Sequence, residues 1–216
     1  MAGYRFDEHG KGYKIGKALQ SYRPQWIVMA SLIKGGSKVL DLGCGDGIQG
    51  QRLIKEKGCE VFGIDLDPIA VTEAKRRGLK AKTGDISKRL NFSDKSFDYV
   101  ICNVVLELVK KPDFLISEML RVGKTVIIGF ENFGFWIYRI EMLSGKFPQH
   151  ALYGHKWYES NFTSFFSLSD FLSLPSLKKA KIKKVIGINW RNRKVSLLAR
   201  LFPNLFSRSC ILVIEN

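Results

Sequence analysis

Residues 39–47 read VLDLGCGDG, an apolar run that reaches an acidic residue and then passes through three glycines. Gly43, Gly45 and Gly47 are spaced by two, a pattern typical of a strand that turns tightly into a helix. Because glycine has no side chain, a ligand can lie directly on the backbone of such a turn. Asp65 closes the next apolar run, where doubly wound sheets place an acid that binds ribose hydroxyls. The two segments together predict a pocket for an adenosine-bearing cofactor.

The charges around this turn select among such cofactors. A dinucleotide fingerprint has its third glycine three positions after the second, where this chain has Ile48. Carboxylates at Asp41 and Asp46 would repel a pyrophosphate at short range, whereas they suit a ligand that carries positive charge. S-adenosylmethionine carries both a sulfonium and an ammonium. The sequence therefore favours S-adenosylmethionine, or its product S-adenosylhomocysteine, over a nicotinamide dinucleotide or ATP.

The bulk composition is that of an ordinary globular protein. The 216 residues suffice for one α/β domain, and 45% of them are hydrophobic. No apolar stretch reaches the ~18 residues of a membrane span, and residues 1–12 do not resemble a secretory signal. We therefore expect a cytoplasmic protein. The four cysteines lack CxxC spacing, so we expect free buried thiols and no metal site.

The net charge of +15 is concentrated toward the end of the chain. Residues 151–216 hold eleven Lys/Arg and three Asp/Glu, a net charge of +8, and eight of these cations fall within residues 178–194. A solvated lysine-rich surface is the preferred interpretation, because neither an RNA-binding motif nor an aromatic-studded basic groove is evident. Nucleic acid, anionic lipid and an acidic partner are the alternatives.

Strands and helices alternate along the first 130 residues. The predicted strands are 38–42, 59–64, 79–82, 97–102 and 125–130, and the predicted helices are 48–57, 68–78 and 112–121. Asp67 is the expected N-cap of the second of these helices, with Pro68 at its first position. A lead-in helix is expected within residues 12–33, interrupted around Pro24. This alternation predicts a parallel sheet covered on both faces.

The composition changes after residue 130. Residues 132–143 are aromatic and apolar, and a mostly irregular stretch is expected to follow up to residue 166. Short helices are predicted at 167–174 and 194–202, and the last two strands at 181–188 and 208–214. We expect a single domain with a lead-in at 1–36, a cofactor-binding core at 37–130 and a partner or substrate elaboration at 131–216.

The pattern DLGCGDG of residues 41–47 is similar to motif I of the class I methyltransferases. This resemblance implies a Rossmann-like doubly wound sheet of seven strands, the last of them antiparallel, with helices on both faces. Ligands of such sheets bind at the carboxyl ends of the strands. The cofactor-binding residues expected there are Asp41, Gly43, Cys44, Gly45, Gly47, Asp65, Leu66, Asp85, Ile86 and Asn103.

Each of these residues has an expected role in the pocket. The glycine turn would face the methionine part, Asp41 the ammonium and Asp65 the ribose. Leu66 would cover one face of the adenine, whose amino group Asp85, beside Ile86, would bind as in the third motif of the family. An aspartate after a glycine is also common as a turn former, so this alternative stays open for Asp85. Asn103, at the end of its strand, would face the sulfonium and the methyl acceptor.

The acceptor side gives a weaker signal. Methyl transfer from a sulfonium is an in-line displacement with a neutral leaving group, so it needs a general base only when the nucleophile is protonated. No catalytic residue is assigned, and residues 103–106 lack the Asn-Pro-Pro-Tyr type of sequence used with amide and adenine-amine acceptors. Candidates for the substrate or partner side, each of which has a structural alternative, are Tyr22, Glu131, Asn132, Trp136, His155, Trp157 and Tyr158.

Further motifs resemble one family in particular, the methionine-biosynthesis protein MetW. They are residues 39–47, SFDYVI at 96–101, EMLRVG at 118–123, NFG at 132–134 with Trp136, and KWY at 156–158. The resemblance implies association with a homoserine O-acyltransferase, which such proteins are thought to bind and activate. Glu131, where the family usually has proline, and the basic segment from Lys178 depart from the pattern.

Three functions follow as hypotheses. The first is an S-adenosylmethionine-dependent enzyme that methylates a small molecule, the ordinary activity of this fold. The second is a cofactor-sensing regulatory subunit of a homoserine O-acyltransferase that performs no chemistry. The third, RNA methylation, rests on the basic segment alone.

Overall fold

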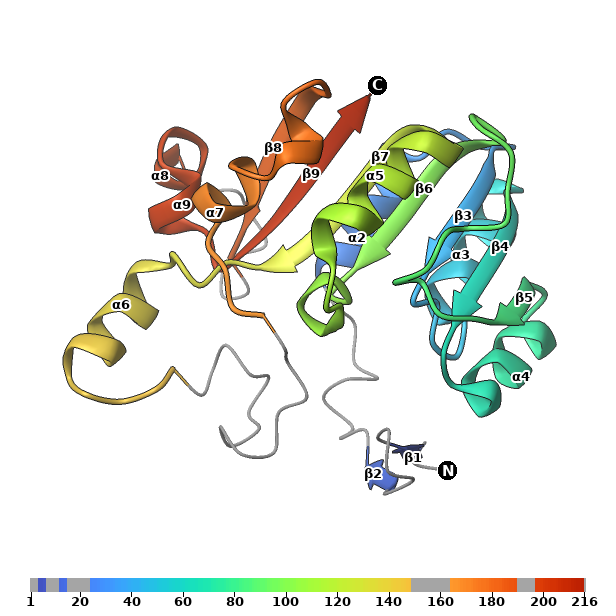
Figure 1. Ribbon diagram of the computed structural model, residues 1–216, viewed down its shortest axis with the longest axis horizontal. Helices are drawn as coiled ribbons and strands as arrows, with labels where there is room; N and C mark the ends of the chain where they lie inside the picture. Colours follow the sequence, from blue (N-terminus) through green and yellow to red (C-terminus); the bar gives the residue numbers. More distant parts are fainter. Residues whose placement is uncertain (1–3, 7–11, 15–23, 149–163, 190–196, 216) are drawn as a thin grey trace.

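A computed structural model of the chain describes residues 4–6, 12–14, 24–148, 164–189 and 197–215. Its main feature is a seven-stranded sheet with the order β5-β4-β3-β6-β7-β9-β8 (Figure 1). The strands are β3 (Lys38–Leu42), β4 (Glu60–Asp65), β5 (Lys80–Thr83), β6 (Phe97–Asn103), β7 (Gly123–Glu131), β8 (Lys181–Ile188) and β9 (Ser209–Glu215). Strands β3 to β7 pair in parallel, and β9 is antiparallel to both of its neighbours. The expected Rossmann-like sheet with its last strand antiparallel is thereby confirmed.

Helices cover both faces of this sheet. They are α2 (Pro24–Leu32), α3 (Ile48–Lys57), α4 (Pro68–Arg76), α5 (Pro112–Val122), α6 (Trp136–Leu143), α7 (Leu168–Leu172), α8 (Leu197–Leu201) and α9 (Pro203–Phe206), with short 3₁₀ turns at Leu106–Leu108 and Pro175–Leu177. Asp67 caps α4 as predicted, because its side chain accepts a hydrogen bond from the Ile69 N–H at 2.8 Å. Among the described residues no helix is long and apolar enough to cross a membrane.

The start of the chain differs from the prediction. Residues Tyr4–Phe6 (β1) pair antiparallel with Gly12–Lys14 (β2), so the lead-in helix expected from residue 12 is wrong over this stretch. Helix α2 begins at Pro24, which was expected to interrupt a helix. Proline is favoured in the first turn, since its missing N–H needs no partner there.

The structure also adds a helix that the sequence analysis did not assign. Residues Trp136–Leu143 form α6, which projects away from the sheet in Figure 1. The segment predicted as one helix at 194–202 is described from Leu197 as α8, and Pro203 then begins α9. The final strands do pair antiparallel beside β7, with a register shift between Ile182 and Lys184.

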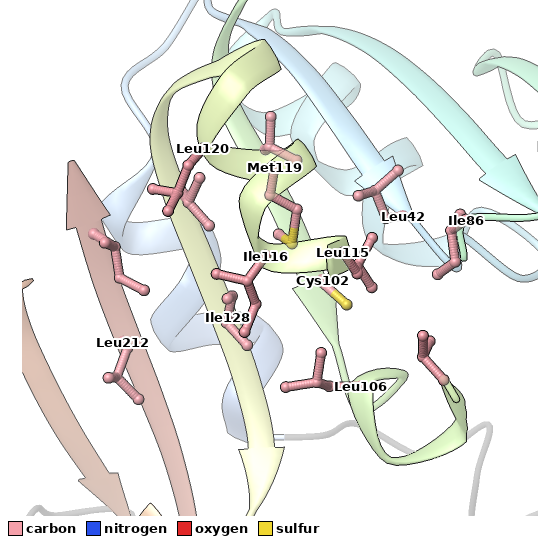
Figure 2. Close-up of a cluster of buried hydrophobic side chains, with 14 of the residues drawn as sticks. Leu42, Ile86, Cys102, Leu106, Leu115, Ile116, Met119, Leu120, Ile128 and Leu212 are labelled. Atoms are coloured by element: carbon pink, nitrogen blue, oxygen red, sulfur yellow. The ribbon is translucent and has the colours of Figure 1, made fainter. Parts of the chain in front are cut away.

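The side chains of successive strand residues point to opposite faces, which divides the core into two layers. On one face α5 packs Leu115, Ile116 and Met119 against the sheet residues Cys102 and Ile128 (Figure 2). On the other face α2, α3 and α4 cover a second buried cluster. All four cysteines are buried and belong to no disulfide between described residues, as predicted.

Arg121 lies in the last turn of α5, directly before Val122 and Gly123, and its contacts explain why a charged residue is found there. Its guanidinium donates to Glu118 and Asp94 at 2.7 Å and to the carbonyls of Leu90 and Phe92 at 2.8 Å. These bonds fasten the loop before β6 to the end of α5. Gly123 then begins β7 directly. The position requires glycine, because a Cβ there would lie 2.6 Å from Val100 Cγ2 in the neighbouring strand.

The turn between β3 and α3 brings α3 very close to α4. Gly47 is the N-cap of α3 with φ +80°, and a Cβ at this position would lie 2.8 Å from the Ala74 Cα. Backbone atoms cannot move as a flexible side chain can. Both the turn and the helix contact therefore require glycine.

We expect Gly47→Ala to lower the free energy of unfolding by more than the ~1–2 kcal/mol that a left-handed alanine alone costs. Gly58→Ala is the matched control, because Gly58 has φ +63° but open space around its Cα. Urea unfolding of both variants measures the difference. An equal loss in the two variants would mean that the α3–α4 contact adds nothing.

Candidate functional site

The N–H groups of the loop after β3 donate hydrogen bonds to oxygen atoms of the protein itself. The N–H groups of Gly43 and Cys44 donate to the Ile64 carbonyl at 2.8 and 3.1 Å, and the Gly45 N–H donates to Asp65 Oδ2 at 2.7 Å. The Gly47 N–H donates to the Cys44 carbonyl at 3.0 Å. These four groups are therefore not arranged as an open cradle for a phosphate, which a dinucleotide site needs.

Asp41 is the most unusual acid of the site. It lies near the carboxyl end of β3, opposite Gly63 of β4, and is buried. Burial and, to a smaller extent, the charge of Asp65 raise the pKa of Asp41 from 3.8 to about 7. Within the described part of the chain no hydrogen-bond donor or cation is seen on its carboxylate. A buried carboxylate of this kind favours a cationic ligand, which would offset its desolvation.

Asp65 closes β4 and holds the glycine loop. Its carboxylate accepts hydrogen bonds from the Gly45 N–H and from the Asp67 N–H, the latter at 3.0 Å. A carboxylate has about four acceptor sites, so two backbone donors leave room for two ligand hydroxyls. Leu66 follows as an exposed apolar side chain, in the place expected for a cover over a flat ring.

Asp46 does not carry the free charge that the sequence analysis assumed. Its Oδ2 lies 3.4 Å from Arg77 Nη2, and the Arg77 Nε donates to the Asp46 carbonyl at 2.8 Å. This ion pair offsets the negative charge at the start of α3. The case against a pyrophosphate therefore depends on Asp41 and Asp65 and on the paired loop N–H groups.

Asp85 forms a local turn. Its Oδ1 accepts from the Ser87 N–H at 2.9 Å and from the Ser87 hydroxyl at 2.6 Å, and Oδ2 lies 3.7 Å from Lys88 Nζ. The Ser87 hydroxyl is the largest cause that lowers the pKa of Asp85. Ile86 is buried in the core beside it. The turn-forming alternative is thus realised, and the adenine contact stays a prediction.

Asn103, at the end of β6, has a buried amide that stands apart from the hydrogen-bonded side chains of the described residues. Neither its Oδ1 nor its Nδ2 makes a hydrogen bond with the described residues. The space that it occupies depends on Gly129, its neighbour in β7, where a Cβ would lie 2.5 Å from Asn103 Oδ1. The next residue, Val104, has φ +55°, a strained conformation for a β-branched residue. Orphaned buried amides and backbone strain both mark functional sites.

Glu131, one of the acceptor-side candidates, is fully buried in a polar network. Its carboxylate accepts from the Tyr138 hydroxyl at 2.9 Å, from Arg208 Nε at 2.8 Å and from the Ser209 hydroxyl at 2.9 Å. Burial and the charge of Glu131 raise the pKa of Tyr138 well above its usual range. The network joins β7, α6 and β9, so the structure gives Glu131 a structural role.

Asn132 is also fully buried. Its Nδ2 donates to the carbonyls of Asn204 and Ser207 at 2.9 and 2.7 Å, and its Oδ1 accepts from the N–H groups of Gly134 and Leu168 at 3.0 and 2.9 Å. One amide thus fastens α7 and α9 to the end of β7. Trp136, in contrast, is exposed at the start of α6. Tyr22, His155, Trp157 and Tyr158 lie outside the described residues.

The carboxyl ends of β3, β4 and β6 therefore gather Asp41, Asp65 and Asn103, as the sequence predicted. Sequence reasoning missed Gly129, which makes room for the Asn103 amide, and the positive φ of Val104. A glycine within a buried strand is a signal for close approach and could have identified the first of them.

Known proteins share this fold. The structure superposes on a chain of the complex between the Haloferax volcanii Trm112 methyltransferase activator and a methyltransferase, with a TM-score of 0.65, 18% identity and coverage of 92% of this chain and 91% of the other. It is also similar to magnesium protoporphyrin IX methyltransferase from Synechocystis, solved with bound S-adenosylhomocysteine, with a TM-score of 0.60, 19% identity and coverage of 89% and 80%. At these identities the likeness concerns the fold alone.

Curated relatives match part of the chain. The bifunctional methionine biosynthesis protein MetXA/MetW of Rhodopirellula baltica is 35% identical over 114 residues, which are 48% of this chain and 18% of that protein. The ubiquinone biosynthesis O-methyltransferase of Hahella chejuensis is 33% identical over 95 residues, which are 41% of this chain and 40% of the enzyme. The chain thus spans less than half the length of these two relatives.

The family comparison covers far more of the sequence. Residues 23–214 match the model of the family described as methionine biosynthesis protein MetW. This range includes every strand of the seven-stranded sheet except the last residue of β9, and all of the acids discussed above. The chain belongs to the MetW family, within the class I methyltransferase fold.

Proposed function

We propose that the chain binds S-adenosylmethionine at the carboxyl ends of β3, β4 and β6. The observation that carries this proposal is the buried Asp41 carboxylate, which has no described cation or donor and stands near a second carboxylate, Asp65. A ligand with an ammonium and a sulfonium offsets both charges, whereas a phosphate adds to them. The fold and the family fit the same ligand, since the solved neighbours include methyltransferases that depend on it.

We propose a role for each residue from its place at this edge of the sheet. Asp41 holds the ammonium, Asp65 binds the ribose hydroxyls, and Leu66 covers the adenine next to Asp85 and Ile86. Asn103 offers its amide to the sulfonium side, where the methyl acceptor must approach. When bound, the cofactor supplies an activated methyl group to a nucleophile held in line. We infer that the chain transfers this methyl group to a small-molecule acceptor.

A second candidate function is a cofactor-sensing subunit of a homoserine O-acyltransferase, acting in methionine biosynthesis. Two observations favour it. The Rhodopirellula baltica relative combines MetXA and MetW in one bifunctional protein. Helix α6 also exposes a set of large apolar side chains, which we call the α6 surface: Trp136, Ile137, Ile140, Met142 and Leu143. An apolar surface on a projecting helix suits a protein partner.

Removing the charge of Asp65 tests the cofactor site. We expect Asp65→Asn to weaken S-adenosylmethionine binding by about 1–3 kcal/mol, because charge-assisted hydrogen bonds to the ribose are lost. Isothermal titration calorimetry measures the change. Asp46→Asn is the matched control, since Asp46 pairs with Arg77 and its loss is expected to leave the affinity nearly unchanged. Equal affinities for Asp65→Asn and the unmodified chain would contradict the ribose assignment.

The raised pKa of Asp41 predicts a pH dependence. A cationic ligand binds the carboxylate form, so the affinity for S-adenosylmethionine should rise by up to about tenfold per pH unit toward pH 7 and level off above it. In the free protein the folded state keeps the proton between pH 3.8 and about 7, so the free energy of unfolding should fall as pH rises through this window. Asp41→Asn should abolish both dependences. Calorimetry and urea unfolding across this range measure them, and identical pH profiles in the two proteins would refute the role of Asp41.

The acyltransferase proposal is tested on the α6 surface. We expect Trp136→Ala to weaken binding to a purified homoserine O-acyltransferase by at least about tenfold, as for a buried aromatic anchor. Phe114→Ala on α5 is the control, because the two rings are almost equally exposed, at 41% for Phe114 and 42% for Trp136. Surface plasmon resonance measures both. Equal affinity of the two variants for the acyltransferase would show that α6 is not part of the interface.

A further inference from the structure

A cavity of about 490 Å³ lies where the parallel strands begin, away from the carboxyl ends that carry Asp41 and Asp65. It is lined by Lys38, the first residue of β3, by Phe97, the first residue of β6, and by Phe62 of β4. The other lining residues come from the loop that precedes β6. Small organic ligands occupy pockets of roughly 300–1,000 Å³. The proposed cofactor site shares no residue with this cavity, which we call the amino-edge cavity.

Three phenylalanine rings form an aromatic wall in the amino-edge cavity. The Phe97 ring packs edge-on against Phe62 and Phe92, with ring centroids 5.4 and 4.9 Å apart and interplanar angles of 74° and 88°. Phe97 is buried, whereas Phe62 and Phe92 are half-buried. Aromatic rings favour this edge-to-face arrangement, and a further flat ring can join it. The wall therefore suits an aromatic group on a ligand.

The wall also carries a half-buried cation. The Lys38 Nζ lies 5.1 Å from the centroids of two of the three rings. Two carboxylates lie near it, but each forms an ion pair with another lysine: Glu60 with Lys80, and Asp98 with Lys124 at 2.8 Å. Within the described ranges no carboxylate lies at ion-pair distance from the Lys38 ammonium. An anion on a ligand can therefore pair with it.

Further polar groups border the aromatic wall. Lys82 of β5 places its Nζ 4.4 Å from the centroid of the Phe92 ring. Asn91 and Ser93, exposed in the loop before β6, add an amide and a hydroxyl to the lining. The two ammonium groups repel a cationic ligand, and a neutral ligand leaves Lys38 without an anion. The cavity therefore combines an apolar wall with a preference for negative charge.

We propose that the amino-edge cavity binds a small molecule that carries an anion on a flat aromatic ring, an aromatic carboxylate or an aryl phosphate. The anion pairs with the Lys38 ammonium, and the ring packs against Phe62 and Phe92. A charged pair at a half-buried site is stronger than one in open water, because less solvent screens it. Inorganic anions lack the ring and neutral aromatic compounds lack the charge, so each binds more weakly.

Titration of the isotope-labelled full chain with phenyl phosphate, and separately with benzoate, tests this proposal by nuclear magnetic resonance. We expect saturable shifts of the amide signals of residues 91–97 and of Lys38, and the tighter probe identifies the anion as phosphate or carboxylate. Inorganic phosphate and benzyl alcohol should bind at least about tenfold more weakly, because each lacks one of the two contributions. Absence of saturable shifts with both probes, or equal affinity for a compound that lacks the ring or the charge, would overturn the proposal.

A competition separates this site from the proposed cofactor site. Saturating S-adenosylmethionine should leave the affinity for the probe unchanged, because Lys38 and Leu42 at the two ends of β3 are about 13 Å apart. Displacement of the probe, with shifts at residues 41–47 in place of residues 91–97, would overturn the proposal. Failure of S-adenosylmethionine to bind would contradict the cofactor site alone, since the probe titration does not depend on it.

Substitutions of Lys38 test the charged half of the cavity. Lys38→Met removes the ammonium but keeps an apolar stem against the rings, and should weaken probe binding by about tenfold or more. Lys38→Arg keeps the charge and should retain most of the affinity. Lys55→Met is the matched control, because it removes the same charge from an exposed position on α3. Equal losses for Lys38→Met and Lys55→Met would show that net charge alone acts, which contradicts a defined site.

Phe92→Leu tests the aromatic half. We expect it to weaken the binding of phenyl phosphate by about threefold or more, because a ring contact is lost, and to leave inorganic phosphate unaffected. Phe114→Leu on α5 is the control, since this exposed ring lies outside the cavity. Thermal unfolding verifies that all variants fold. Equal affinity of Phe92→Leu and the unmodified chain for phenyl phosphate would contradict a contact between the ligand ring and the aromatic wall.

Discussion

The hydrogen bonds between the end of β4 and the loop after β3 are the constraint on which the site depends. The Ile64 carbonyl and the Asp65 carboxylate together accept three N–H groups of that loop. These bonds hold the loop at the carboxyl edge of the sheet. The three N–H groups donate to protein oxygens and therefore do not point toward a ligand. The chemistry left at this edge belongs to side chains, chiefly the buried Asp41 and the Asn103 amide. The proposed ligand, a cation with hydroxyl groups, suits these side chains, whereas the phosphate cradles of other doubly wound sheets depend on open N–H groups.

Local sequence signals predicted most of this edge. The three glycines adopt positive φ values of 54–80°, and the cap of α4 at Asp67 depends on residues within one turn of each other. Such short-range features can be predicted from a sequence because the side chain and its partner are close together along the chain. Strand β8 and helix α3 were predicted with the bounds that the structure has, for the same reason.

The features that escaped prediction depend on contacts between distant segments. The buried Asn103 amide requires Gly129 in the next strand, and the ion pair of Asp46 requires Arg77, the C-cap residue of α4. Glu131 and Asn132 were candidates for the acceptor side, and the structure buries both side chains among hydrogen-bond partners from residues 134–209. Helix α6 was not assigned from the sequence; of its two aromatic residues, Tyr138 is buried against β7 residues and Trp136 is exposed.

The register shift in β8 has a consequence for association between copies of the chain. It interrupts the ladder between β8 and β9 at Lys183, while the strand at the opposite edge of the sheet, β5, carries Lys80 and Lys82. A strand added from another molecule would meet ammonium groups at either end of the sheet, which natural proteins use against edge-to-edge aggregation. Intermolecular β-sheet growth is therefore disfavoured even where many copies crowd together.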